Sequence, residues 1–558
     1  MRKTLLTACL LIASATQAQV LYVNNANGTY QAFDTKTTKN ITFDEEQKLV
    51  HIQLGSVNSN ETIVSSFNTA KATNIAPASN QGTELTYDLN PVVAFDTKDE
   101  SNYNEIVETI ITDETIDESG DFVENFNTNR IITITFSENG VKTSTLPDQV
   151  TTTIENGHIT INSERSKVGY RVTGTCSNGS LKIYSLKKFQ IMTQNLNLTN
   201  PKGPAINIQS GKTVYFTMLT GTNNTLCDGA TYGAATIGTD GIEEDQKGTL
   251  FSEGQIIFNG LGTLNVKSLG GHAIASDDYI RIRSGNINIV EAAKDGFHTK
   301  DKFILSRTEA SAPTVSIKAT SNGIDCREGH ITIEAGKMTI ESGSEAIKAV
   351  YEEPIPDPLV SPDTYINGGF VKIVTTDEKS SAIKTTRNYI QKGGVIHADV
   401  KGNGSKIINC DNEVTIAGGK LTGFSRGTIA TDTTSAGGIK SENVLKMTGG
   451  IIAIECSGKG AKGINSNSDV IIEGGEITLL TKAANYTDIA DDKKSRGIIA
   501  NSVTVNGGKI VASAYNNAIT ATTITVNDGI VNAYSESSYA LGTDAVQTGG
   551  WLLTKDNE

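Results

Sequence analysis

The fold of this chain is decided by a phrase that first occurs as YIRIRSGNINI at residues 279–289. In it, a short apolar strand leads into a glycine turn, and a second short strand follows. The phrase returns as far as the C-terminus, with its glycine at Gly285, Gly336, Gly369, Gly394, Gly419, Gly450, Gly475, Gly508, Gly529 and Gly550. From Gly369 onward the spacings are 25, 25, 31, 25, 33, 21 and 21 residues. This regularity indicates coils joined by glycine bends.

Apolar residues flank these glycines in a constant phase. Ile282 and Ile333 stand three residues before their glycines, and Ile287 and Met338 stand two residues after them. Alternation with period two is typical of strands with one buried face, and such a coil buries that face by stacking on its neighbours. The repeat therefore predicts an all-β solenoid, in which one chain winds coil upon coil into a parallel β-helix. The alternative is a series of β-sandwiches, which would show hairpin signals about every 8–12 residues.

The beginning of the chain has the features of a secretory signal peptide. Arg2 and Lys3 precede an apolar run from Leu5 to Ala15, and Ala18 ends a small-residue cleavage site. No later stretch reaches the ~20 apolar residues of a membrane span. We expect a signal peptide over residues 1–18 and an exported protein, secreted or at the cell surface, with no transmembrane segment.

Charge and cysteine content argue against two classes of site. The chain has 48 basic and 62 acidic residues, and loss of the signal peptide removes two basic ones, so the mature charge is 46 − 62 = −16. This acidity argues against nucleic acid as a partner and suits cations, and through them acidic polymers. The cysteines are widely spaced, with no CxxC and no Cys/His pairing, so no zinc site is expected from them.

Three regions are predicted. After the signal peptide, residues 19–147 form a small β region, with a hairpin signal at Asn27-Gly28, and an acidic linker. Between Glu84 and Glu124 there are thirteen acidic residues and one basic residue, Lys98, a composition typical of a linker. Residues 148–558 form the repeat domain.

Six phrases in the first half of the repeat domain carry a resemblance to a known family. They are GSLKIY (179–184), PAINIQSGK (204–212), NTLCDG (224–229), KGTLFSEG (247–254), HAIASDDYIRI (272–282) and KDGFHTKD (294–301). In these phrases the chain resembles secreted bacterial proteins with carbohydrate-binding domains. The resemblance extends over roughly residues 148–545. It implies a right-handed parallel β-helix like that of pectate lyases, with bound calcium and with plant-type polysaccharides, acidic pectic chains and cellulose among them, as ligands.

Six carboxylates fall at equivalent places in successive coils. They are Asp277, Asp278, Asp295, Asp301, Asp325 and Glu328. Stacking would bring such groups to within ~5 Å of one another, where they repel unless a cation lies between them. Calcium prefers six to eight oxygen ligands, and the family resemblance points to the same ion. These residues are the predicted Ca²⁺ ligands; the alternative is that they are turn residues, because aspartate favours turns.

Residues near these turns are candidates for contact with a sugar. Arg281 and Arg283 share the strand face opposite to Ile280 and Ile282, which predicts an exposed basic stripe suited to an anionic sugar chain. His272 and His298 could face sugar hydroxyls, act as general bases or hydrogen-bond within a turn. Tyr279 could stack on a single sugar.

These observations predict a secreted, non-catalytic protein that binds a polysaccharide, pectic or otherwise plant-type, in a calcium-dependent way. Two alternatives remain. One is a pectate-lyase-like polysaccharide lyase, which would need calcium and a basic side chain near the sugar's α-carbon; Arg281, Arg283, Arg307 and Arg327 are candidates by location. The other is a structural surface adhesin whose solenoid spaces other parts.

Overall fold

The computed structural model describes residues 119–238, 241–351, 360–488 and 493–556, together with the backbone of six strands between Val20 and Ala76. The predicted signal peptide and residues 84–118 of the predicted acidic linker lie outside the described residues. The chain divides into two units, residues 93–443 and residues 1–92 with 444–558. The first unit contains the candidate site.

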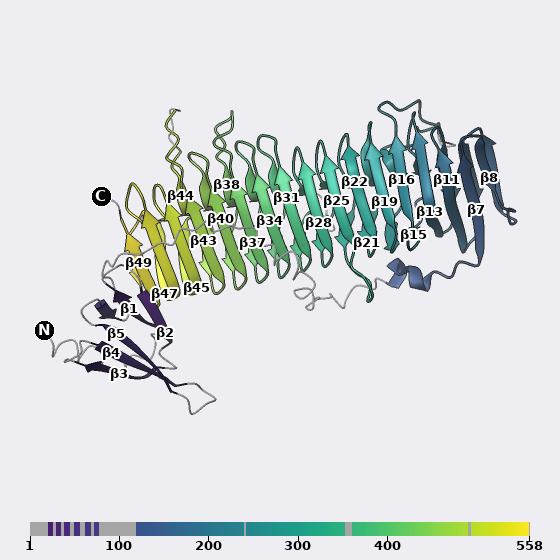
Figure 1. The fold of residues 1–558 in the computed structure, drawn as a ribbon. Coiled ribbons are helices and arrows are strands. Elements are labelled where there is room, and N and C mark those ends of the chain that lie inside the picture. The colour runs from purple at the N-terminus through teal and green to yellow at the C-terminus, as the bar shows by residue number, and fades with distance from the viewer. Residues whose placement is uncertain are drawn as a thin grey trace. The chain divides into compact units, whose positions relative to one another are not determined.

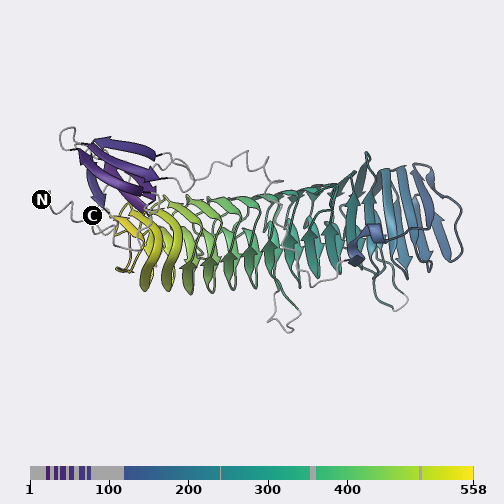
Figure 2. The ribbon, with the colours of Figure 1, turned by 90° about the horizontal axis from the view of Figure 1, so that it is seen from below.

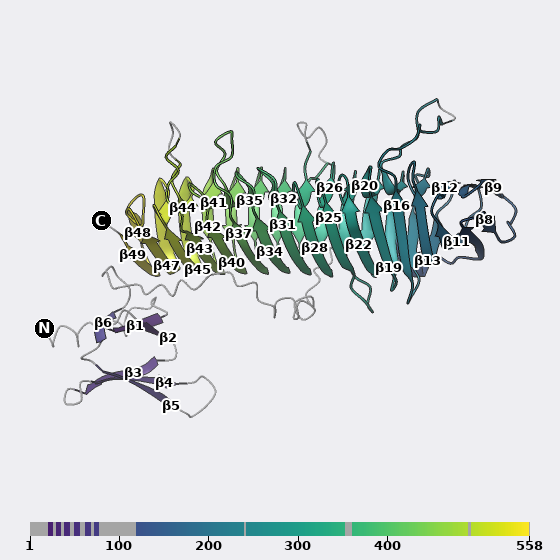
Figure 3. The same ribbon diagram turned by 45° about the horizontal axis from the view of Figure 1, so that its top comes forward.

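Three parallel ladders of strands build the unit of residues 93–443, and a strand of each ladder follows in turn along the chain (Figure 1). Ladder A contains β10 (His158–Ser163), β12 (Ser180–Ser185), β14 (Ile206–Ile208), β17 (Gly248–Ser252), β20 (His272–Ser276), β23 (Phe297–Thr299), β26 (Ile324–Cys326), β29 (Ile347–Ala349), β32 (Ser381–Thr385), β35 (Lys406–Cys410) and β38 (Gly437–Ser441). Several of its strands lie side by side in Figure 3, from β20 to β35. From β14 onward, each coil of this unit therefore consists of one strand from each ladder, and each strand pairs with the strand three further on.

The other two ladders complete every coil. Ladder B contains β15 (Val214–Met218), β18 (Ile256–Gly260), β21 (Tyr279–Ile282), β24 (Lys302–Leu305), β27 (Ile331–Ile333), β30 (Thr364–Ile366), β33 (Tyr389–Gln391) and β36 (Val414–Ile416). Ladder C contains β16 (Asn223–Asp228), β19 (Thr263–Ser268), β22 (Asn286–Ala292), β25 (Thr314–Ala319), β28 (Lys337–Ser342), β31 (Phe370–Thr375), β34 (Val395–Val400) and β37 (Lys420–Ser425). Long parallel pairing of this kind confirms the predicted parallel sheets. It argues against a series of β-sandwiches, which would require antiparallel hairpins.

The first strands of this unit are longer and partly antiparallel. They are β7 (Arg130–Ser137), β8 (Gly140–Thr143), β9 (Val150–Glu155), β11 (Val168–Cys176) and β13 (Phe189–Asn200). The strand β7 pairs in parallel with β11 and antiparallel with β8, and β9 pairs antiparallel with β10. Before them, two 3₁₀ turns, η1 (Ser119–Asp121) and η2 (Val123–Asn125), form a strap of residues 119–126.

The core consists of columns of apolar side chains that repeat from coil to coil. In ladder A, the register aligns Ile274, Phe297, Ile324, Ile347, Ile383, Ile408 and Ile439, all of them buried. Burying a side chain of this size contributes roughly 1.5–3 kcal/mol relative to exposure. Because every coil adds members to the same columns, the stack forms one continuous core.

The glycine register predicted from the sequence is confirmed. All ten glycines of the repeated phrase have positive φ. At Gly419, φ is 75°, and a Cβ would stand 2.3 Å from the carbonyl oxygen of Gly393 in the preceding coil. A side chain is therefore excluded there both by backbone conformation and by the close approach of the preceding coil.

The second unit also contains only strands among its described elements. Its parallel strands are β39 (Leu445–Met447), β40 (Ile451–Cys456), β41 (Lys462–Ser466), β42 (Asp469–Ile472), β43 (Glu476–Thr481), β44 (Arg496–Ile499), β45 (Ser502–Ala514), β46 (Ile519–Thr520), β47 (Thr523–Ser535), β48 (Ala545–Gln547) and β49 (Trp551–Lys555). Its N-terminal strands are β1 (Val20–Asn25), β2 (Tyr30–Asp34), β3 (Thr38–Asp44), β4 (Leu49–Gly55), β5 (Thr62–Asn68) and β6 (Ala72–Ala76). These six form two antiparallel sheets, and β1 and β2 flank the predicted Asn27-Gly28 turn.

The prediction of an all-β protein with long parallel sheets is thus confirmed. Cys176, Cys326, Cys410 and Cys456 are buried, and the five cysteines of the described residues are all free thiols. Within the described part of the chain, no helix is long and apolar enough to cross a membrane.

Candidate functional site

The corner between ladders A and B gathers charged side chains in two columns. The register aligns Ser252, Ser276, Thr299 and Cys326 at the ends of four ladder A strands. One residue further on, the first column contains Glu253, Asp277, Lys300 and Arg327. The second column contains Gly254, Asp278, Asp301 and Glu328. Three of the predicted calcium ligands, Asp278, Asp301 and Glu328, therefore do stand at equivalent places in successive coils.

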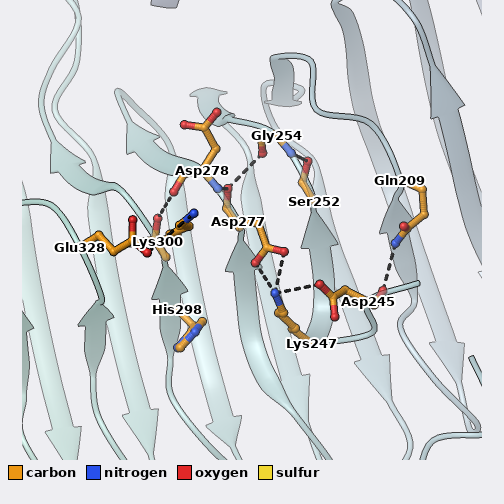
Figure 4. Close-up of polar contacts among 12 residues, drawn as sticks. Gln209, Asp245, Lys247, Ser252, Gly254, Asp277, Asp278, His298, Lys300 and Glu328 are labelled. Atoms are coloured by element: carbon orange, nitrogen blue, oxygen red, sulfur yellow. Dashed lines mark hydrogen bonds and ion pairs between the residues drawn. The ribbon is translucent and has the colours of Figure 1, made fainter. Parts of the chain in front are cut away.

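Asp277 belongs to a separate group that also includes residues of the loop before β17. The Nζ of Lys247 lies 2.5 Å from Oδ1 of Asp277 and 2.9 Å from Oδ2 of Asp245 (Figure 4). Carboxylate oxygens of Asp245, Glu253 and Asp277 all lie within 4.8 Å of one another. Three carboxylates thus share a single lysine, and we call this group the acidic corner.

The pKa values of the acidic corner reflect this crowding. Burial, followed by the charges of Asp277 and Asp245, raises the pKa of Glu253 to about 7. Burial also raises the pKa of Asp277, in spite of its hydrogen bonds with Lys247. In its ionised form the corner has three negative charges against the single positive charge of Lys247.

Asp278 points away from Asp277 (Figure 4). Gln255 donates a hydrogen bond to its carboxylate. Burial, followed by the charge of Asp301, raises the pKa of Asp278 to about 6. At the end of the column, Glu328 lies 3.7 Å from Nζ of Lys300.

Asp295 lies in the turn before β23, at the opposite edge of ladder A, and Asp325 lies on the outer face of β26. Both are beside the two histidines. Oδ2 of Asp295 lies 3.1 Å from Nδ1 of His272 and 3.1 Å from Nδ1 of His298. Oδ2 of Asp325 lies 3.3 Å from Nδ1 of His298, and its Oδ1 lies 3.4 Å from Nζ of Lys348. The two imidazole rings stack with their centroids 4.1 Å apart. We call these four residues, His272, Asp295, His298 and Asp325, the histidine pair site.

The pKa values of the two histidines are shifted in opposite directions. Burial lowers the pKa of His272, which favours the neutral ring. Burial alone would do the same to His298, but hydrogen bonds to Asp295 and Asp325 raise its pKa to about 8. Burial opposes the ionisation of Asp295 as well, yet its contacts with His272 and His298 hold its pKa far below the usual range.

The predicted basic stripe is not exposed, and this expectation was wrong. Arg281 is 1% exposed, because it forms an ion pair with Asp121 of the strap of residues 119–126. Figure 2 shows the 3₁₀ turns of the strap in blue beside the strands of this unit. Nη1 of Arg281 lies 2.8 Å from Oδ2 of Asp121, and the hydroxyl of Tyr279 donates to the other oxygen of the same carboxylate. The sequence separates these partners by about 160 residues, so no local pattern could have paired them.

Arg283 and Tyr215 are held by the same strap. Nη1 of Arg283 lies 2.7 Å from Glu124, and its guanidinium lies 4.3 Å from the centroid of the Phe122 ring. The hydroxyl of Tyr215 donates to the carbonyl of Gly120 at 2.6 Å. Tyr279, Arg281 and Arg283 thus anchor a segment of this chain.

The six predicted calcium ligands therefore occupy three places rather than one. The acidic corner offers oxygen ligands alone, as calcium prefers, whereas Asp295 and Asp325 face imidazole nitrogens, which calcium does not favour. Sequence reasoning missed Asp245 and Glu253. Glu253 could have been found, because aligning Ser252 with Ser276 places it one coil from Asp277. Asp245 lies in a loop outside the repeat and gave no such signal.

Comparison with known proteins adds two similarities. The family model described as carbohydrate-binding domain-containing protein matches residues 155–460. A solved structure, the polysaccharide lyase-like protein from C. thermocellum as a gadolinium derivative, is similar at 20% sequence identity and a TM-score of 0.37. That similarity covers 51% of this chain and 95% of the other. No curated protein matches the chain.

Proposed function

Because this chain belongs to the carbohydrate-binding domain-containing protein family, we propose that it is an exported protein that binds a polysaccharide without cleaving it, with Ca²⁺ as a structural ion. The family match over residues 155–460 is the observation that carries the proposal. The N-terminal signal sequence supports export, to the medium or to the cell surface.

The finer fold assignment is part of the same proposal. From β14 onward in the unit of residues 93–443, each strand pairs in parallel with the strand three further on, and the connection between such parallel strands is right-handed in roughly 98% of cases. A right-handed parallel β-helix satisfies both the pairing and this rule. Such a fold places equivalent residues of every coil in straight columns, which suits a polymer with a repeating unit.

The outer face of ladder A offers a column of lysines to an anionic polymer. Register aligns Lys348 with Lys384, and Lys384 with Asn409 and then Lys440. Paired strands are ~4.8 Å apart, so Lys348 and Lys384 are separated by one such step and Lys384 and Lys440 by two. Burial, followed by the charges of Lys440 and Lys384, lowers the pKa of the adjacent Lys406 to about 8. We assign the contact with acidic sugars, such as the uronates of pectic chains, to Lys348, Lys384 and Lys440.

Calcium would be held by Asp245, Glu253 and Asp277. Their oxygens lie close together, and the raised pKa of Glu253 supports a place for a cation. When bound, the ion supplies positive charge that joins the loop before β17 to the coil of β20. This role is structural, since the corner lies apart from the lysine column in the register of ladder A.

The ion pairs of Arg281 and Arg283 support the proposal that the protein does not cleave its ligand. A lyase base must reach the sugar, yet Arg281 and Arg283 are buried in ion pairs with Asp121 and Glu124. Each guanidinium is therefore already bound within the chain.

A binding assay tests the proposal. The full chain should be retained by immobilised polygalacturonate at low salt, more strongly than by neutral cellulose or xylan. A variant with Lys348, Lys384 and Lys440 changed to Gln should lose this retention, because it removes the aligned charges. The matched control changes the exposed Lys142, Lys318 and Lys372 to Gln and should keep it, although the net charge is the same. Equal retention of both variants would exclude the lysine column, and lack of retention on every polysaccharide would exclude the function.

A further inference from the structure

The histidine pair site lies in two neighbouring columns of ladder A. Counting two residues back from the aligned Ile274, Phe297 and Ile324 places His272, Asp295 and Asn322 in one column. The register also aligns His298, Asp325 and Lys348 in the next column. Three successive coils thus contribute His272, then Asp295 and His298, then Asp325. All four side chains come from rigid strands or the turns that lead into them.

The potential ligand atoms of this cluster converge on one place. Oδ2 of Asp295 lies 3.1 Å from Nδ1 of His272, and the backbone N–H of Asp295 lies 3.3 Å from the same nitrogen. Nδ1 of His298 lies 3.1 Å from the same carboxylate oxygen. When neither Nδ1 carries a proton, these two nitrogens and the oxygen all present lone pairs within 4.8 Å of one another. A metal ion would satisfy all three atoms together.

Hydrogen bonds to Oδ1 of Asp295 fix the orientation of its carboxylate. Its Oδ1 accepts hydrogen bonds from the backbone N–H of Asn322 at 3.0 Å and from its side-chain amide at 2.9 Å. This leaves Oδ2 directed at the two rings. Such outer partners orient the ligands of metal sites in proteins, and their loss typically costs 10–100-fold in affinity.

The distances fit a transition-metal ion. Ligands bound tetrahedrally to zinc at 2.0–2.1 Å stand about 3.3 Å from one another. The three separations here are 3.1, 3.1 and 3.3 Å, the last between His298 and Asp325. Imidazole nitrogen with carboxylate oxygen suits zinc, copper and nickel, whereas calcium selects oxygen.

We propose that His272, His298 and Asp295 bind a divalent transition-metal ion, with Asp325 as a fourth ligand. The site is separate from the acidic corner and needs no cysteine, which explains why the cysteine spacing gave no sign of it. In its metal-free form, a proton on His298 between Asp295 and Asp325 takes part of the place of the metal. Metal binding therefore displaces a proton, and affinity falls as pH is lowered.

The test is titration of the metal-free, untagged full chain with ZnCl₂ in a calorimeter, in the presence of excess Ca²⁺. We expect one Zn²⁺ per chain, with proton release that shows as a dependence of the heat on buffer. His272→Ala and His298→Ala should each weaken binding by roughly 100-fold or more, since each removes a direct ligand. His330→Ala, a histidine outside the cluster, and Asp277→Asn should leave it unchanged.

Electron paramagnetic resonance of the Cu²⁺-loaded wild type gives a readout that needs no variant. Hyperfine structure from two nitrogens is the expected result. Failure of the wild type to bind Zn²⁺, or binding that both histidine substitutions leave intact, would overturn the proposal. So would a copper spectrum without nitrogen coupling, even if the substituted chains fold poorly.

Discussion

The guanidinium of Arg281 and the carboxylate of Asp121 form an ion pair of 2.8 Å between a ladder B strand and the strap, 160 residues apart in the chain. Arg281 is nearly inaccessible, and Asp121 is buried. The neighbouring pair, Arg283 with Glu124, differs in one respect, because the Glu124 side chain is 56% exposed. The same strap thus contains a buried and an exposed ion pair, which allows their contributions to be compared.

We expect Asp121→Ala to destabilise the chain far more than Glu124→Ala. Removing one partner of a buried pair leaves an uncompensated charge and costs about 3–5 kcal/mol, whereas exposed pairs contribute about 0–1 kcal/mol. The measurement is the midpoint of thermal unfolding of each variant, followed by circular dichroism. Equal shifts would mean that the strap is held by its apolar contacts, such as Phe126 against Tyr215.

A double substitution separates charge from packing at this pair. Asp121→Leu with Arg281→Met replaces both charges with apolar groups, and buried pairs replaced in this way often recover or exceed the original stability. We expect the double variant to melt above Asp121→Ala. A double variant that melts at or below Asp121→Ala would show that the unpaired charge of Arg281 is not what destabilises the single variant.

Stability in chelator should fall as pH rises, over a lower and a higher pH range that overlap near pH 7. The folded-state pKa of Glu253 is raised from 4.5 to about 7, so its contribution is present at low pH and is lost between these values. The pKa of His298 is raised from 6.5 to about 8, so its contribution is lost in that higher range. The measurement is the unfolding midpoint against pH in excess chelator. Glu253→Gln should make the profile less steep in the lower range, where Asp278 also contributes, and should leave the higher range unchanged. An unchanged profile in this variant would contradict the assignment.

No cleavage of polygalacturonate is expected. A lyase would form an unsaturated product whose ultraviolet absorbance rises in proportion to the protein concentration. The incubation should contain Ca²⁺ at alkaline pH, the conditions that favour a basic side chain in its reactive form. An increase that disappears in Arg327→Ala, a variant of an arginine that is exposed beside Glu328, would establish the lyase alternative.

The repeat made the coils predictable from the sequence, but it did not predict contacts with segments that lie outside the repeat. Gly285 and Gly419 have the positive φ that their place in the phrase requires, because the same bend recurs in every coil. The same register could have aligned Glu253 with Asp277. By contrast, Asp245 and Asp121 reach the coils from a loop and a strap with no repeating pattern. Their positions depend on tertiary packing, so the sequence could not show that Arg281 is covered.

The last prediction concerns the calcium dependence of stability. An ion that binds the folded state alone stabilises it by about 2.7 kcal/mol when its concentration is a hundred times Kd. Chelation should therefore lower the unfolding midpoint of the wild type. Asp277→Asn with Glu253→Gln should remove this dependence, because both substitutions keep side-chain size and remove charge from the acidic corner. Asp295→Asn is the matched control and should retain it, since Asp295 faces histidines.

Lys247 gives this prediction a second test with the opposite sign. Its ammonium lies between Asp245 and Asp277, where it competes with a cation for the same oxygens. Lys247→Gln should therefore strengthen Ca²⁺ binding and enlarge the difference between the midpoints in calcium and in chelator. If calcium leaves the midpoints of both the wild type and this variant unchanged, the three carboxylates are turn and loop residues whose charge Lys247 alone offsets.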